Sequence, residues 1–195
     1  MALDKVHPQQ LPRLYVLMRN LFPGPEMLVD CVDQRDQVVG KVKRKDIFRG
    51  SCGFRTVHVF VVNSNGKLLL QQQSHSRDRA PLTWGSSVAA YLFSGETYEK
   101  AAARRLQQEL GVSDVDITLL GVLHLKDLGH DKFVGLAFVE SSGPFTPDPN
   151  HIERVRLMSP NQVLARWRKG SMALTPTFLA LLEFYNRVRG QDTVT

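Results

Sequence analysis

The order of apolar and polar residues changes from a helical period to a strand-like one near residue 27. An amphipathic helix is predicted at 11–22, and Pro23-Gly24-Pro25 would end it. We expect three parts: a helical extension over 1–27, one folded domain over 28–190, and a short tail over 191–195.

Apolar runs rich in β-branched residues predict strands in the first half of the domain. They cover 28–32, 38–42 and 56–63. Asn65-Gly66 separates the third run from another at 67–72, and Asn-Gly is the preferred two-residue hairpin turn because both positions adopt positive φ. We therefore expect an antiparallel hairpin around this dipeptide.

A long helix is predicted between Thr97 and Gly111. Thr97 is a good N-cap, and Glu99 lies in the first turn, where the helix dipole favours a negative charge. Strong helix formers continue to Leu110, and Gly111 ends the helix. The remaining predicted elements are strands at 84–92, 117–126, 132–140 and 155–158 and helices at 160–169 and 176–188, each helix with a proline in its first turn.

Composition fits one globular domain. The chain has 195 residues, of which 43% are hydrophobic and 23% charged, which excludes a disordered chain. It contains no apolar run long enough to span a membrane, and the run at 14–18 is too short for a signal peptide. Two cysteines, Cys31 and Cys52, do not make a disulfide framework, so we expect a cytoplasmic location.

The net charge of +6 is concentrated in one segment. Between Lys41 and Arg55 there are six basic residues and one acidic residue. Such a segment attracts anions, which include phosphates, nucleic acid and acidic surfaces, or it simply forms a solvated face. The sequence does not favour nucleic acid, because it contains no recognised binding module and no aromatic platform.

The long helix also carries a spaced motif. Gly95-Glu96 is followed, after seven residues, by Arg104-Arg105-Leu106-Gln107-Gln108-Glu109-Leu110-Gly111-Val112. This spacing resembles the Nudix box, and the resemblance extends over about 28–188, nearest to the branch of isopentenyl-diphosphate isomerase and its hydrolase relatives. It implies an α+β Nudix fold with a mixed sheet between helices, and a loop and helix that hold Mg²⁺ against a diphosphate. It also implies that four residues brace the loop against the helix: Gly95, Glu96, Arg104 and Gly111.

The motif departs from the family pattern at the positions that hold metal. Ala90 replaces the leading glycine, and Arg105 and Gln108 replace two of the three glutamates, so Glu109 is the metal ligand and catalytic group that remains. Arg105 and Glu109 are four residues apart on a helix, a spacing that also favours an ion pair. Mg²⁺ commonly accepts one or two protein carboxylates together with substrate phosphates, so a single glutamate predicts a weak site that the ligand completes.

The isomerase activity of that branch is not expected. Its proton transfer needs a cysteine two residues before a metal-binding histidine, and Ala89 and Tyr91 stand at those positions. No histidine occurs between 46 and 54, where the other histidine ligands would fall. The acidic pair aligns with Asp131 and Phe133, and the aromatic that covers the carbocation aligns with Thr177.

The resemblance also implies a phosphate cradle. The family's contacts to diphosphate fall near Arg44, Gln73, Arg77 and Arg105, so three of the four positions are cationic. Guanidinium groups bind phosphate in a bidentate manner. Alternatively, these arginines are solvated or pair with surface acids.

A second set of metal ligands is available in the segment 124–132. With Glu109, its side chains could form a mixed nitrogen and oxygen site for Mn²⁺ or Zn²⁺. The same segment resembles an ordinary polar hairpin loop, which is the interpretation we favour. Glu109 and Asp131 are thus the candidate metal ligands, with Mg²⁺ or Mn²⁺ as the ion. The four side chains that make up this second set of possible ligands are His124, Asp127, His130 and Asp131.

Two further side chains have an ordinary interpretation and a functional one. His58, on an apolar strand, fits a buried core residue better than a catalytic one. Cys52 lies beside glycine in the cationic segment, where nearby cations could lower the pKa of a thiol. A small residue in a turn is the simpler explanation for Cys52.

Two functions follow from these observations. The first is a metal-assisted hydrolase that cleaves a diphosphate linkage in a small nucleotide, sugar or isoprenoid metabolite. The second is a Nudix-fold protein that binds a phosphorylated ligand for regulation without turning it over. We place hydrolysis narrowly first, and the helix at 11–22 offers a surface for a homodimer.

Overall fold

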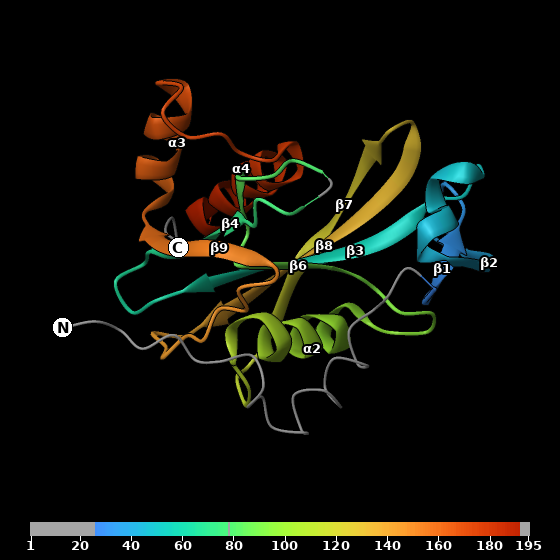
Figure 1. Ribbon diagram of the computed structural model, residues 1–195, viewed down its shortest axis with the longest axis horizontal. Coiled ribbons are helices and arrows are strands. Elements are labelled where there is room, and N and C mark those ends of the chain that lie inside the picture. Colours follow the sequence, from blue (N-terminus) through green and yellow to red (C-terminus); the bar gives the residue numbers. More distant parts are fainter. Residues whose placement is uncertain (1–25, 78, 192–195) are drawn as a thin grey trace.

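The computed structural model describes residues 26–77 and 79–191, arranged as a central sheet with helices on both faces (Figure 1). The helix predicted at 11–22 and the residues 192–195 lie outside the described part. No described helix has both the length and the apolar character needed to cross a membrane.

The main sheet is mixed. Strands β3 (Phe54–Val62) and β8 (His130–Glu140) run parallel at its centre, in a register from Phe54 opposite Lys132 to Val62 opposite Glu140. The other strand pairs of this sheet are antiparallel, and Trp84 of β5 also makes an isolated parallel bridge with Leu174. The strand order is β5-β4-β3-β8-β7, with β6 beside β3 and β9 beside β4. The outer strands are β4 (Leu68–Gln73), β5 (Trp84–Gly85), β6 (Val88–Tyr91), β7 (Thr118–Asp127) and β9 (Ile152–Met158).

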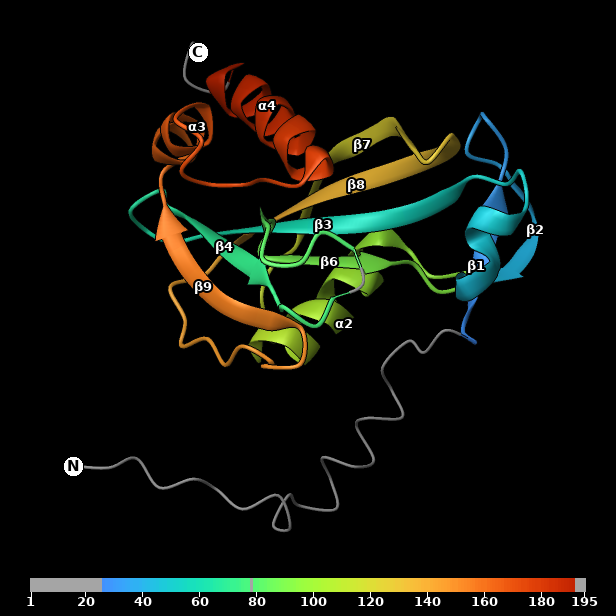
Figure 2. The ribbon, with the colours of Figure 1, turned by 45° about the horizontal axis from the view of Figure 1, so that its top comes forward.

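Two hydrophobic cores explain why β3 is apolar on both faces. Val57, Val59 and Val61 pack with helix α2 (Tyr98–Leu110) on one face. Phe60 and Val62 pack on the other face, with residues of α3 (Pro160–Arg168) and α4 (Pro176–Gln191). Figure 2 shows α2 on one side of the sheet and α3 with α4 on the other. The expected α+β fold, a mixed sheet between helices, is confirmed.

A separate two-stranded ribbon holds most of the cationic segment. It consists of β1 (Leu28–Val32) and β2 (Val38–Lys43), followed by the 3₁₀ helix η2 (Arg44–Arg49). Val29, Ile47 and Phe54 form a small third core that ties the ribbon to the main sheet.

The single strand predicted at 84–92 is in fact two strands. The Ser87 hydroxyl accepts the Val61 N–H at 2.8 Å and donates to the Leu69 carbonyl at 2.5 Å. This serine therefore bridges β3 and β4 at the point where the chain changes partner, from β4 to β3.

The polar loop expected at 124–132 is a tight hairpin. β7 runs to Asp127 and β8 starts at His130, so Leu128 and Gly129 form the turn, with φ of 50° and 86°. Polar side chains in this segment were misleading, because they stand on paired strands that are exposed on one side.

Candidate active site

Helix α2 begins and ends where the sequence predicts. The Thr97 side chain accepts the Lys100 N–H, and Gly111 ends the helix in the left-handed conformation at φ 68°. The Gly111 N–H donates to the Gln107 carbonyl and the Val112 N–H to the Leu106 carbonyl, which satisfies the last turn.

The loop before α2 is braced by two acids. The Glu96 carboxylate accepts two hydrogen bonds from the Arg104 guanidinium, with both nitrogen to oxygen distances 2.8 Å. It also accepts the Phe93 N–H at 2.8 Å. The motif residues Glu96 and Arg104 thus make the contact that we expected from the resemblance. Asp30 of β1 accepts from the Ser94 hydroxyl at 2.7 Å and from the Gly95 N–H at 3.0 Å. Sequence reasoning missed Asp30, because it lies 65 residues from Gly95 along the chain.

Arg105 and Glu109 form a buried ion pair on the inner side of α2. Their side chains are 7% and 3% exposed, and Arg105 also donates to Gln108 Oε1 at 3.4 Å. Burial lowers the pKa of Arg105, whereas the charge of Glu109 opposes that change. Arg105 Nε and Glu109 Oε2 are buried and have no hydrogen-bond partner among the described residues. The pair is therefore only half satisfied.

The chain that leaves β8 closes over the end of α2. The Thr146 N–H bonds the Leu110 carbonyl at 2.8 Å, and the Asp148 N–H bonds the Glu109 carbonyl at 2.9 Å. Asp148 itself is buried, but hydrogen bonds from Asn150 and His151 outweigh burial and lower its pKa. This acid, which the motif does not contain, lies close enough for its charge to act on Arg105.

Two of the expected phosphate-binding arginines lie near a common tyrosine. Arg44 stands over the Tyr91 ring, 5.6 Å from its centroid, and its Nε is buried without a partner among the described residues. The charge of the exposed Arg77 acts on both Tyr91 and Arg105, so this arginine lies within electrostatic range of both. Burial raises the pKa of Tyr91, and the charges of the nearby arginines, Arg79 among them, oppose this.

Asp131 is not brought together with Glu109. Its carboxylate pairs with Lys126 at 2.7 Å and with His124, and these hydrogen bonds lower its pKa. The Glu109 carbonyl instead bonds the segment that leads into β9, a strand that pairs with β4. Asp131 belongs to β8, and β3 lies between β4 and β8 in the sheet. Within 26–77 and 79–191, no group of three or more His, Cys, Asp or Glu is placed to hold a metal.

The two side chains with open interpretations are both structural. His58 is buried and bonded to the Ser86 hydroxyl at 2.9 Å, and burial lowers its pKa to about 3. Burial and the neighbouring Cys31 raise the pKa of Cys52 to about 12, so the suggestion of a low-pKa thiol is wrong. Desolvation is the largest cause of this rise.

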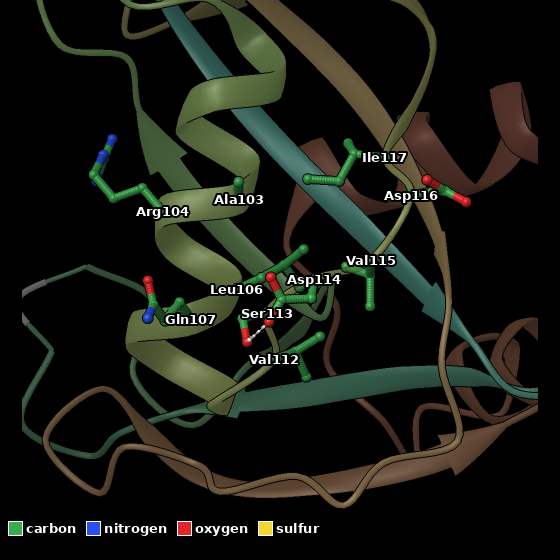
Figure 3. Close-up of a pocket in the computed structure, with 10 residues that line it drawn as sticks. All are labelled: Ala103, Arg104, Leu106, Gln107, Val112, Ser113, Asp114, Val115, Asp116 and Ile117. Atoms are coloured by element: carbon green, nitrogen blue, oxygen red, sulfur yellow. Dashed lines mark hydrogen bonds between the residues drawn. The ribbon is translucent and has the colours of Figure 1, made fainter.

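A depression of about 270 Å³ lies elsewhere on α2 (Figure 3). Its wall includes Arg104 and Gln107 from the helix and the segment 112–117, in which the Ser113 hydroxyl bonds Asp114 at 2.9 Å. Neither Arg105 nor Glu109 lines it, so it is separate from the candidate site.

Known proteins share this architecture. The NUDIX domain model matches residues 54–178. An uncharacterized Nudix hydrolase of Nostoc sp., all7351, is 32% identical over 164 residues, which is 81% of this chain and 95% of that protein. An isopentenyl-diphosphate Delta-isomerase of Nocardia farcinica is 29% identical over 165 residues, covering 80% of this chain and 93% of that protein.

Solved structures agree. The crystal structure of DR0079 from Deinococcus radiodurans superposes with a TM-score of 0.71 at 29% identity, covering 83% of this chain and 98% of that one. The NUDIX domain of Shewanella oneidensis NrtR, solved with ADP ribose, has a TM-score of 0.57 at 17% identity. The match covers 76% of this chain and 92% of that one, and it supports the fold alone. The chain therefore belongs to the NUDIX family.

Proposed function

We propose that this protein hydrolyses a diphosphate linkage in a small metabolite, with Glu109 as the acidic group at the reacting centre. One observation carries the proposal: Arg105 and Glu109 form a buried ion pair in which Arg105 Nε and Glu109 Oε2 have no hydrogen-bond partners among the described residues. A buried polar group without a partner costs about 1–3 kcal/mol, so such a pair favours a ligand that satisfies both atoms.

A diphosphate with a divalent cation fits these two atoms, because the cation can bind the Glu109 carboxylate, which like phosphate only accepts hydrogen bonds. The diphosphate oxygens accept hydrogen bonds from Arg105 and compete with Glu109 for the guanidinium, which frees the glutamate. Arg77, whose charge already acts on Arg105, adds a second cation within electrostatic range. Ligand binding would therefore open the ion pair that closes the site in its absence.

The residues fit a divalent metal only together with the ligand. Glu109 would hold Mg²⁺ or Mn²⁺ jointly with phosphate oxygens, which is how Mg²⁺ is commonly bound. When bound, the ion would supply charge stabilisation at the phosphoryl group and lower the pKa of an attacking water. Asp131 takes no part in this proposal, because it is paired with Lys126 and His124.

A second function, ligand binding without turnover, is favoured by a different observation. Arg105 neutralises the one motif glutamate that remains, and Gln108 offers an amide where the family has a carboxylate. A site of this kind binds phosphate through arginines and lacks the negative charge that concentrates metal.

A ligand screen separates the two functions. The shift in Tm would be measured with nucleoside, sugar and isoprenoid diphosphates, with Mg²⁺ or Mn²⁺, and each ligand that stabilises the protein would be assayed for phosphate release. The hydrolase proposal expects release that Glu109→Gln abolishes and Glu99→Gln, an exposed glutamate on the same helix, preserves. Stabilisation without release, unaffected by Glu109→Gln, would leave binding as the function.

We also propose a cytoplasmic location, which the two free cysteines support. The homodimer stays a prediction, because residues 11–22 lie outside the described part of the chain.

A further inference from the structure

The sheet face that packs against α4 carries a polar cluster next to Tyr91. In the strand register, Thr56 of β3 lies opposite Tyr91 of β6 and Val134 of β8, so these side chains share one face. Lys132 precedes Val134 by two residues and stands on the same face, opposite Phe54. Core residues on this face pack against α4, which identifies the face.

Two buried polar atoms near Tyr91 have no hydrogen-bond partner within the described part of the chain. Thr56 is 6% exposed, and its hydroxyl has no hydrogen-bond partner among the described residues. Arg44 Nε, above the Tyr91 ring, is also buried and has no hydrogen-bond partner among the described residues. Native proteins leave few buried polar groups unpaired, so two near one side chain indicate a place where another molecule supplies the partner.

Lys132 brings a positive charge that its surroundings compensate only in part. The residue is 8% exposed, and its Nζ lies 3.1 Å from the Thr177 hydroxyl and 3.5 Å from Asp127. Asp127 makes its closer contact, 2.8 Å, with Arg79. Two cations therefore share one carboxylate, which leaves a surplus positive charge in a region of low dielectric.

The start of α4 adds a favourable field. Thr177 lies in the first turn of this 16-residue helix, and the N-terminal end of a helix carries a partial positive charge. The Phe178 N–H is capped by Thr175 at 3.3 Å, so the end of the helix is ordered.

We propose that Lys132, Thr177 and Thr56 bind an anionic group, a carboxylate or a phosphate, on the part of the substrate beyond the diphosphate. This rests on the proposed function: the arginines at Tyr91 and the pair at Arg105 take the diphosphate, and the cluster on the α4 face takes the far end. An isoprenoid tail does not fit, because it would cover the surplus charge of Lys132 and the unpartnered Thr56 hydroxyl without supplying an acceptor to either.

Two matched ligand pairs test this inference. UDP-glucuronate differs from UDP-glucose by a carboxylate, and coenzyme A differs from dephospho-coenzyme A by a phosphate. The wild-type protein is expected to bind the anionic member of at least one pair ten times more tightly or better, as measured by calorimetry, which is about 1.4 kcal/mol. The pair that responds identifies the group as carboxylate or phosphate.

Variants connect the preference to the cluster. Lys132→Met is expected to bring the affinity ratio of the responding pair close to one, and Thr177→Val to reduce it. Lys126→Met, in the neighbouring strand and paired with Asp131, serves as the matched control and should preserve the ratio. If Lys132→Met does not fold, the affinity ratio of the responding pair is measured in Thr177→Val and Thr56→Val, and a reduced ratio in these variants supports the inference.

Binding of inorganic pyrophosphate distinguishes a failure of the proposed function from a failure of the inference about the anionic end. If pyrophosphate fails to bind the wild type, the proposed function fails. If pyrophosphate binds but neither pair discriminates, or the discrimination persists in the cluster variants, the inference about the anionic end is overturned while the proposed function stands.

Discussion

At the scale of single residues, the Arg105–Glu109 pair dominates the candidate site. Two charges with 7% and 3% exposure have lost most of their hydration, and each stabilises the other. Removing one partner of such a pair strands the other charge, whereas removing both leaves no charge to solvate.

The first prediction is a double-mutant cycle on this pair. Glu109→Gln and Arg105→Met should each lower the free energy of unfolding by about 3 kcal/mol, because each leaves a buried charge alone. The double variant should lose clearly less than the sum, as measured by urea denaturation. Additive losses would contradict a coupled pair.

Helix period explains which residue contacts the sequence could predict. Arg105 and Glu109 are four residues apart on one helix, so their pairing follows from local geometry. Asp30 and Asp148 come from distant segments and depend on how the sheet is assembled, so no spacing in the motif indicates them. The same holds for Lys132, whose neighbours Thr177 and Asp127 belong to two other elements.

At the scale of elements, the contact of α2 with β8 depends on a glycine. A Cβ built on Gly135 would lie 2.3 Å from Tyr98 Cδ1, so the first residue of α2 packs directly on the strand backbone. Side chains larger than hydrogen would push the helix start away from the sheet.

The second prediction concerns this contact. Gly135→Ala should lower the free energy of unfolding by about 1–3 kcal/mol through overpacking, as measured by urea denaturation. The same change in a Tyr98→Ala background should cost less. Gly40→Ala is the matched control in strand β2, where an added Cβ meets nothing within 4 Å, and it should be neutral or slightly stabilising. An equal cost at both glycines would count against the packing explanation.

Element types followed from the sequence better than element boundaries did. The period of apolar residues, together with caps and turn residues, predicted α2 and the β3–β4 hairpin. The expected two-residue turn was wrong, because Gly66 has positive φ, at 69°, and Asn65 does not. The break between β5 and β6 was missed because β6 pairs with β3, which is remote in the chain. The tight β7–β8 turn was missed for a different reason: the polar side chains of these two strands are typical of a loop. Polar residues on an exposed strand look like a loop until the partner strand is known.

At the scale of the whole molecule, the cationic segment is less free than its composition suggests. Lys43 and Lys45 pair with Glu26, Arg49 pairs with Asp46, and Arg55 pairs with Asp36. Arg44 instead lies over Tyr91. The net charge of the chain therefore predicted an anion-binding tendency, whereas the fold selects which arginine faces the candidate site.

The third prediction is the pH dependence of stability. The pKa of His58 is about 3 in the folded protein against 6.5 for an ordinary histidine. Below pH 6.5 the unfolded chain takes up a proton that the folded protein does not, so stability is lost as the pH falls from 6.5 towards 3, by about 2 kcal/mol at pH 5. His58→Gln should remove this part of the pH dependence in denaturation curves.

Exposed His75 provides the control for that prediction. His75→Gln should leave the dependence between pH 6.5 and 5 nearly unchanged, because this side chain is 76% exposed. Identical curves for wild type and His58→Gln would show that the buried histidine does not govern acid stability.

The most direct test of hydrolysis at the Arg105–Glu109 site is ³¹P NMR of a bound diphosphate metabolite, incubated with Mg²⁺ and each protein. With wild type and Glu99→Gln, we expect the diphosphate resonances to disappear and product phosphate resonances to appear. With Glu109→Gln, the rate should fall by about a hundredfold or more, because the carboxylate proposed to hold the metal is lost. Unchanged diphosphate resonances with the wild-type protein, or equal rates in wild type and Glu109→Gln, would contradict hydrolysis at this site.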